Sequence, residues 1–140
     1  MNRSAPFIVG LFCALVLTAC GESSEEKAQK TVCDARADIS KQVDELKGLT
    51  PSTFSTSAVS QNLSAIQSDL SDIKSAQSDL SDDRRQQVEN ATQTFESQVE
   101  GIVKQIGTST TAANAASTIT AALQQLASSY EQAFSRVDCS

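Results

Sequence analysis

Cysteine is the residue type in this sequence whose positions best support covalent chemistry. The 140 residues include four cysteines and no histidine. Without histidine, the commonest general base and the commonest neutral metal ligand are both missing, so most catalytic and metal-binding arrangements lose their main candidate. The cysteines are Cys13, Cys20, Cys33 and Cys139. The last two enclose nearly all of the sequence that can fold, so they constrain how its elements are arranged.

Clustered acidic residues are a weaker candidate for chemistry. They are Asp69, Asp72, Asp79, Asp82 and Asp83. They lack the alternating ligand spacing and the glycine of a calcium loop, and on helices most of them would face solvent. The many Ser and Thr residues have no histidine or well-placed lysine to activate them. We therefore expect no metal, no cofactor and no catalytic site.

Composition limits the class of partner and the kind of core. The chain has 11 basic and 17 acidic residues, a net charge of −6. No basic stretch is interleaved with aromatic residues, which argues against a nucleic-acid-binding surface. The length fits one small domain. With no Trp and one Tyr, its core must be built mainly from Leu, Ile, Val and Ala.

The first twenty residues have the pattern of an export signal. Arg3 provides a short positive region, and residues 5–17 form an apolar run that is too short to cross a bilayer as a helix. The run ends in a four-residue motif, Leu17-Thr18-Ala19-Cys20. This motif resembles the lipobox of bacterial lipoproteins, in which a small-residue cleavage site is followed at once by the cysteine that is lipidated.

The lipobox resemblance implies that residues 1–19 are removed, together with Cys13, and that Cys20 becomes the lipidated first residue. Two or three acyl chains would anchor the protein stably. We then expect the protein at the extracytoplasmic face of a cell membrane, with a polar tether over 20–30 and a helical domain over 31–140. The polar composition of residues 21–26 fits a tether or a frayed helix start. An ordinary secretory signal with a chance cysteine is the alternative.

Apolar residues recur at helical spacing in four segments. The first starts near Val32 and is ended by Gly48. The second contains a heptad-like seam with Gln77 in one of its positions. The seam consists of Leu63, Ile66, Leu70, Ile73 and Leu80. The pattern resumes one residue late at Val88, so Ser81 is predicted to cap a third helix, which Gly107 ends. The fourth spans about 116–137.

The two remaining cysteines test this topology. Four helices in an antiparallel up-down bundle bring Cys33 and Cys139 to the same end of the molecule. A single unbroken helix over 59–106 would place them at opposite ends, so they could not pair within one chain. An exported chain with two cysteines favours a disulfide. We therefore predict an all-α four-helix bundle closed by a Cys33–Cys139 disulfide, with intermolecular or redox pairing as alternatives.

Several features together resemble small helical lipoproteins of actinobacteria: the lipobox, the acidic tether, the Cys-Asp-Ala-Arg sequence over 33–36, and a cysteine near the C-terminus. The resemblance implies a cell-envelope location and no activity. We expect a non-enzymatic module that binds or spaces envelope components, with the heptad seam as a possible surface for an envelope protein or a second copy. The alternative is a carrier or sensor that holds a small apolar ligand near Tyr130 and Phe134.

Overall fold

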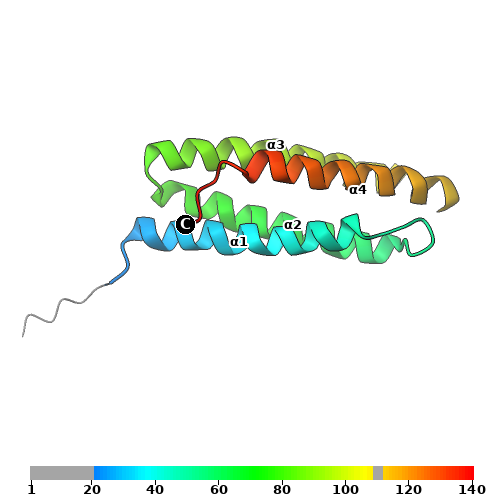
Figure 1. The fold of residues 1–140 in the computed structure, drawn as a ribbon, viewed down its shortest axis with the longest axis horizontal. Coiled ribbons are helices and arrows are strands. Elements are labelled where there is room, and N and C mark those ends of the chain that lie inside the picture. The colour runs from blue at the N-terminus through cyan, green and yellow to red at the C-terminus, as the bar shows by residue number, and fades with distance from the viewer. Residues whose placement is uncertain (1–20, 109–111) are drawn as a thin grey trace, which may run out of the picture.

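The computed structural model describes residues 21–108 and 112–140. It contains four long helices and one short 3-10 helix: α1 (Ser24–Lys47), α2 (Thr56–Ala76), η1 (Gln77–Asp79), α3 (Asp82–Thr108) and α4 (Ala112–Phe134). Within the described ranges there is no strand. The helices run side by side as a bundle in which α1 contacts α2 and α4, and α3 contacts α2 and α4 (Figure 1). The predicted all-α four-helix bundle is confirmed.

The first helix begins earlier than its apolar pattern indicates. Ser23 caps it through a capping box, in which the Ser23 hydroxyl accepts from the Glu26 backbone N–H and the Glu26 carboxylate accepts from the Ser23 N–H. Ala28 is already buried in the core. Residues 24–30 of the predicted polar tether therefore form the first turns of α1, and residues 21–23 precede the helix.

The chain reverses direction where the apolar pattern changes phase. Helix α2 passes into η1, and Leu80 then adopts an extended backbone with ψ of 152° while its side chain stays buried. Helix α3 follows at once, and the Arg85 N–H donates to the Ser81 carbonyl over 2.8 Å. Helices α2 and α3 are therefore separate, as predicted, and the single long helix is excluded.

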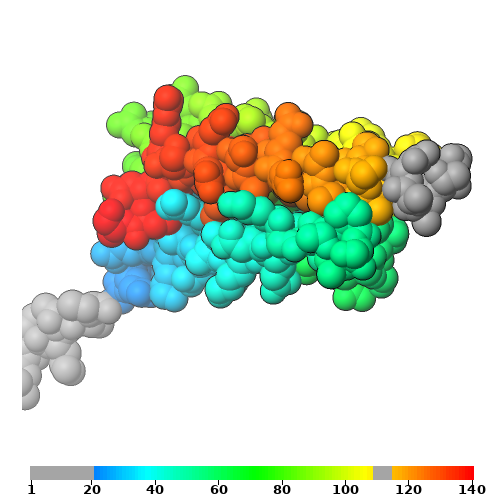
Figure 2. Space-filling model, turned by 45° about the vertical axis from the view of Figure 1, so that its right-hand side comes forward, coloured from blue at the N-terminus to red at the C-terminus, as the bar shows by residue number. Residues whose placement is uncertain are grey.

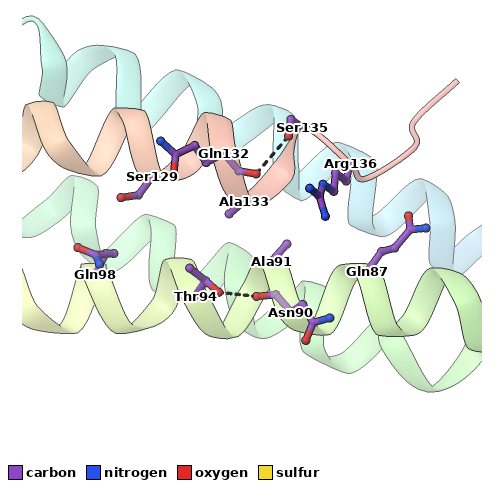
Figure 3. A pocket seen from close by; sticks show the side chains of 10 residues that line it. All are labelled: Gln87, Asn90, Ala91, Thr94, Gln98, Ser129, Gln132, Ala133, Ser135 and Arg136. Carbon is purple, nitrogen blue, oxygen red and sulfur yellow. Dashed lines mark hydrogen bonds between the residues drawn. The ribbon is translucent and has the colours of Figure 1, made fainter.

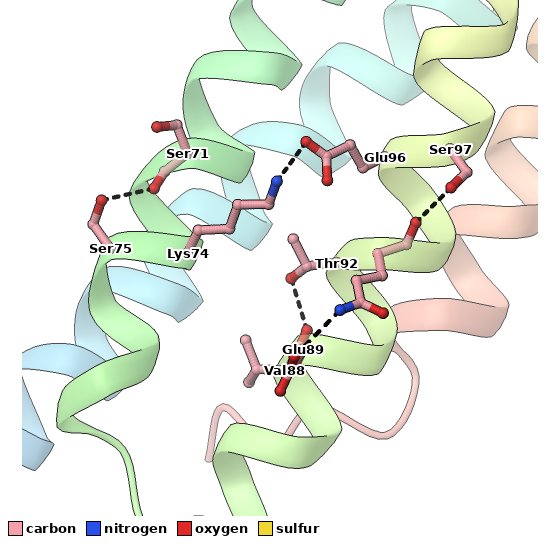
Figure 4. A network of polar contacts seen from close by, with 9 residues as sticks. Ser71, Lys74, Ser75, Val88, Glu89, Thr92, Glu96 and Ser97 are labelled. Atoms are coloured by element: carbon pink, nitrogen blue, oxygen red, sulfur yellow. Dashed lines mark hydrogen bonds and ion pairs between the residues drawn. The ribbon is translucent and has the colours of Figure 1, made fainter.

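Aliphatic side chains from all four helices fill the interior. The apolar residues that recur at helical spacing in α1 are buried, namely Val32, Ala35, Ile39, Val43 and Leu46. The buried hydroxyl of Thr92 donates to the Val88 carbonyl one turn earlier over 2.7 Å, so it leaves no unsatisfied donor in the core. Nearer the surface, Lys74 of α2 and Glu96 of α3 form an ion pair at 2.6 Å (Figure 4).

A disulfide joins the first helix to the C-terminal tail at one end of the bundle. Cys33 of α1 and Cys139 lie with their Cα atoms 5.6 Å apart, and the predicted bond is present. It holds the C-terminal tail, which we define as residues 135–140, against the first half of α1, where the two ends of the colour scale meet (Figure 2). Inside this contact, an Arg36 guanidinium N–H donates to the Val137 carbonyl over 2.9 Å.

Tyr130 connects the same region to the core. Its hydroxyl donates to the Arg36 carbonyl over 2.7 Å, so Arg36 bonds to both α4 and the tail. Burial raises the pKa of the Tyr130 phenol above its usual range, and its hydrogen bonds to Ser40 and Arg36 offset part of that increase. The phenol is therefore held in its protonated form as a hydrogen-bond donor.

Removing the disulfide should lower the free energy of unfolding substantially. The bond closes a loop with a sequence separation of 106, and the chain-entropy model gives about 4.7 kcal/mol for a loop of this size. We expect the Cys33→Ser/Cys139→Ser double variant to lose most of that amount in urea unfolding. Reduced wild type is the matched control and should unfold like the variant. A double variant as stable as oxidised wild type would contradict the prediction.

Stability should also fall at alkaline pH through Tyr130, the one tyrosine in the sequence. Because its pKa is raised in the folded state, its contribution is complete below about pH 10 and is lost as the pH rises through the folded-state pKa. We expect Tyr130→Phe to cost about 1 kcal/mol at pH 7 through the lost hydrogen bond. In urea unfolding at pH 7 and 11, the variant should lose less stability than wild type between the two pH values. An equal loss in both proteins would refute the assignment.

Candidate functional site

The heptad seam lies inside the bundle. Its five side chains are at most 4% exposed: Leu63, Ile66, Leu70, Ile73 and Leu80. They pack in the common core of the four helices, so a partner would have to displace a helix to reach them. Among the described residues, the one large apolar side chain that is exposed is Val103. The described part of the surface therefore offers no apolar stripe for docking, so a partner that binds there is recognised through polar contacts.

The proposed position for an apolar ligand is occupied by aromatic rings. Phe95 of α3 packs against Tyr130 and Phe134 of α4, with ring centroids 5.5 and 5.8 Å away, and the two α4 rings are 5.1 Å apart, so the three rings form a triangle. These are contact distances for aromatic pairs. The three rings fill the space between α3 and α4, so nothing in their arrangement favours the carrier hypothesis.

The remaining predicted residues fall into two groups. Cys20, together with the expected signal peptide over 1–19, lies outside the described residues. The acidic residues of the predicted cluster are described, and no group of three or more His, Cys, Asp or Glu within the described ranges is placed to hold a metal ion. Partial burial and the charges of Asp38 and Asp72 raise the pKa of Asp69. Burial and the neighbouring carboxylates account for this raised pKa without a bound metal ion.

A groove about 690 Å³ in volume lies between α3 and α4, and its lining is mainly polar and uncharged (Figure 3). On one side it is lined by α3 residues Gln87, Asn90, Ala91, Thr94 and Gln98. On the other side it is lined by Ser129, Gln132 and Ala133 of α4 and by Ser135 and Arg136 of the tail. We call it the α3–α4 groove.

The polar side chains of the α3–α4 groove are available for binding. Within the described structure, the amides of Gln87, Asn90, Gln98 and Gln132 make no hydrogen bond. Arg136 is exposed and forms no ion pair with a described residue. These groups provide donors and acceptors along both walls and one positive charge. The arrangement can bind a polar ligand, but it contains no side chain suited to act as a general base.

The sequence contains a signal for this groove that the apolar pattern hides. Gln87, Asn90, Thr94 and Gln98 recur at three- and four-residue spacing beside the buried positions of α3, so they form one continuous polar stripe. Helix α4 carries a single charged side chain, Glu131. A search for uncharged polar faces, in addition to apolar ones, would have marked both walls.

Comparisons with known proteins identify no relative of this chain. No protein-family model, no curated protein and no solved structure matches the chain. Among the described helices, none combines the length and the apolar character that are needed to cross a membrane.

Proposed function

We propose that this protein is a non-enzymatic binding module of the cell envelope, anchored to the extracytoplasmic face of a membrane by lipid on Cys20, with the α3–α4 groove as its binding site. The observation that carries the proposal is the groove, where exposed amide side chains without a hydrogen-bond partner in the described structure and one positive charge line a hollow between two helices. The lipobox-like motif over 17–20 supports the anchor.

The described structure is compatible with close attachment to a membrane. Three residues, 21–23, separate Cys20 from the first residue of α1, a span of about 10 Å when extended. Anchoring would therefore hold the start of α1, η1 and the C-terminal tail near the lipid headgroups. Glu22, Glu25 and Glu26 lie at this end, and their charges are repelled by anionic lipids. Attachment would then depend on the acyl chains.

The groove supports binding without catalysis. Arg136 is the one charged side chain in its lining, and its guanidinium offers hydrogen-bond donors but no acceptor. The other polar groups are amides and hydroxyls, which donate and accept hydrogen bonds without exchanging protons with a substrate. This lining fits recognition of a polar partner in the envelope.

The anchor is tested by changing Cys20 to Ser. We expect wild type to fractionate with membranes and to carry added lipid mass on its N-terminal peptide, because stable anchoring needs two or more acyl chains. Cys20→Ser should lose both properties. Cys13→Ser is the matched control, because this cysteine lies in the segment expected to be removed, and it should behave like wild type. A wild-type peptide without lipid mass would refute the anchor.

A further inference from the structure

The α3–α4 groove differs in charge from the rest of the bundle. Helix α1 carries six acidic and five basic side chains, whereas α4 carries one acidic side chain. The groove has no acidic side chain in its lining and a single basic one, Arg136. A ligand that depends on several ion pairs would find no partners there. The lining therefore selects for a mainly uncharged ligand with one negative charge.

The amide side chains determine which uncharged groups fit. Each Gln or Asn presents a carbonyl acceptor beside an N–H donor. A peptide unit presents the same two functions, so a side-chain amide and a main-chain amide can pair reciprocally. Such groups stand on both walls, at Asn90 and Gln98 of α3 and at Gln132 of α4 (Figure 3). Amides on α3 and the amide of Gln132 on the facing wall can pair with an extended main chain lying between the helices.

The dimensions of the groove limit the length and bulk of that chain. From Gln87 to Gln98 the α3 wall spans eleven positions, or about 16 Å at the helical rise per residue. An extended peptide covers this distance with about five residues. Ala91 and Ala133 lie opposite each other between the polar walls (Figure 3). Their small side chains provide the open space and favour a peptide with small side chains.

Arg136 gives the groove a direction. It lies at the end next to Gln87, where α4 has already passed into the tail (Figure 3). Its guanidinium is free, and this group binds a carboxylate through two parallel hydrogen bonds. The groove lining has no aromatic side chain on which a sugar ring can stack, because Phe95, Tyr130 and Phe134 are buried in the core. A peptide with a free carboxylate therefore fits better than a neutral glycan.

We infer that the α3–α4 groove binds the C-terminal end of a short, extended peptide with small uncharged side chains, and that Arg136 receives its terminal carboxylate. The amides of Asn90, Gln98 and Gln132 hold the main chain. This inference rests on the proposed function, because it names the partner class of the same groove.

The test uses the full chain, expressed with its own signal, purified in detergent micelles and labelled with ¹⁵N. The probe is acetylated penta-alanine, as the free acid and as the C-terminal amide. We expect the free acid to shift the side-chain amide signals of the groove and to bind about tenfold more tightly than the amide form, a modest value for a charge-assisted pair that stays partly hydrated. Equal affinity for the two forms would overturn the inference without any variant being needed.

Two variants with matched controls identify the contacts. Arg136→Ala should bind both peptide forms as weakly as wild type binds the amide form, whereas Lys47→Ala removes an exposed positive charge outside the groove and should bind like wild type. Gln132→Ala should weaken binding about threefold, whereas Gln124→Ala makes the same change on α4 outside the groove lining and should have no effect. A preference for the free acid that survives Arg136→Ala would overturn the inference.

The two proposals fail in different ways. A chain that binds the peptide but carries no lipid at Cys20 refutes the proposed anchor and leaves the inference intact. A lipidated chain that ignores both peptide forms refutes the inference alone. Binding of a neutral chitin-type oligosaccharide at the groove amides, with no response to either peptide, also overturns it.

Discussion

The reversal of the chain at Leu80 is the constraint on which the rest of the structure depends. Because α2 and α3 are separate helices, the bundle has four long helices and not three. An antiparallel bundle with an even number of helices has both chain ends on the same side. Cys33 and Cys139 can then meet. At Leu80 the backbone is extended between η1 and α3, and the side chain remains in the core. The reversal therefore exposes no large apolar side chain at this residue.

Packing then decides which surfaces are left for function. The bundle has few aromatic residues, and nearly all the large apolar side chains of its described helices pack against one another. The heptad seam is therefore buried in the interior. The surface that remains is polar, and on α1 it is dense with charges of both signs. Along the contact between α3 and α4, by contrast, the surface is almost uncharged, and Ala91 and Ala133 are too small to close the groove there. The groove is thus a by-product of small residues in a well-packed bundle.

Local periodicity made most of the fold predictable. The four helices, the break before Ser81 and the disulfide follow from the spacing of apolar residues and from the need of two cysteines to meet. The spacing of apolar residues does not predict the start of α1 at Ser24, because a capping box and not an apolar face determines it. The groove was missed because it depends on how α3 and α4 are rotated about their own axes. That rotation brings Gln98 opposite Ser129, a relation that no single segment encodes.

The disulfide also determines how mechanical force would pass through this protein. In a chain anchored at Cys20, a pull on a ligand held by Arg136 crosses three residues to Cys139, passes through the disulfide to Cys33, and continues through thirteen residues to the anchor. The covalent path bypasses α2, α3 and α4. Tension between membrane and ligand would therefore load the first turns of α1 and leave most of the helical core unstretched.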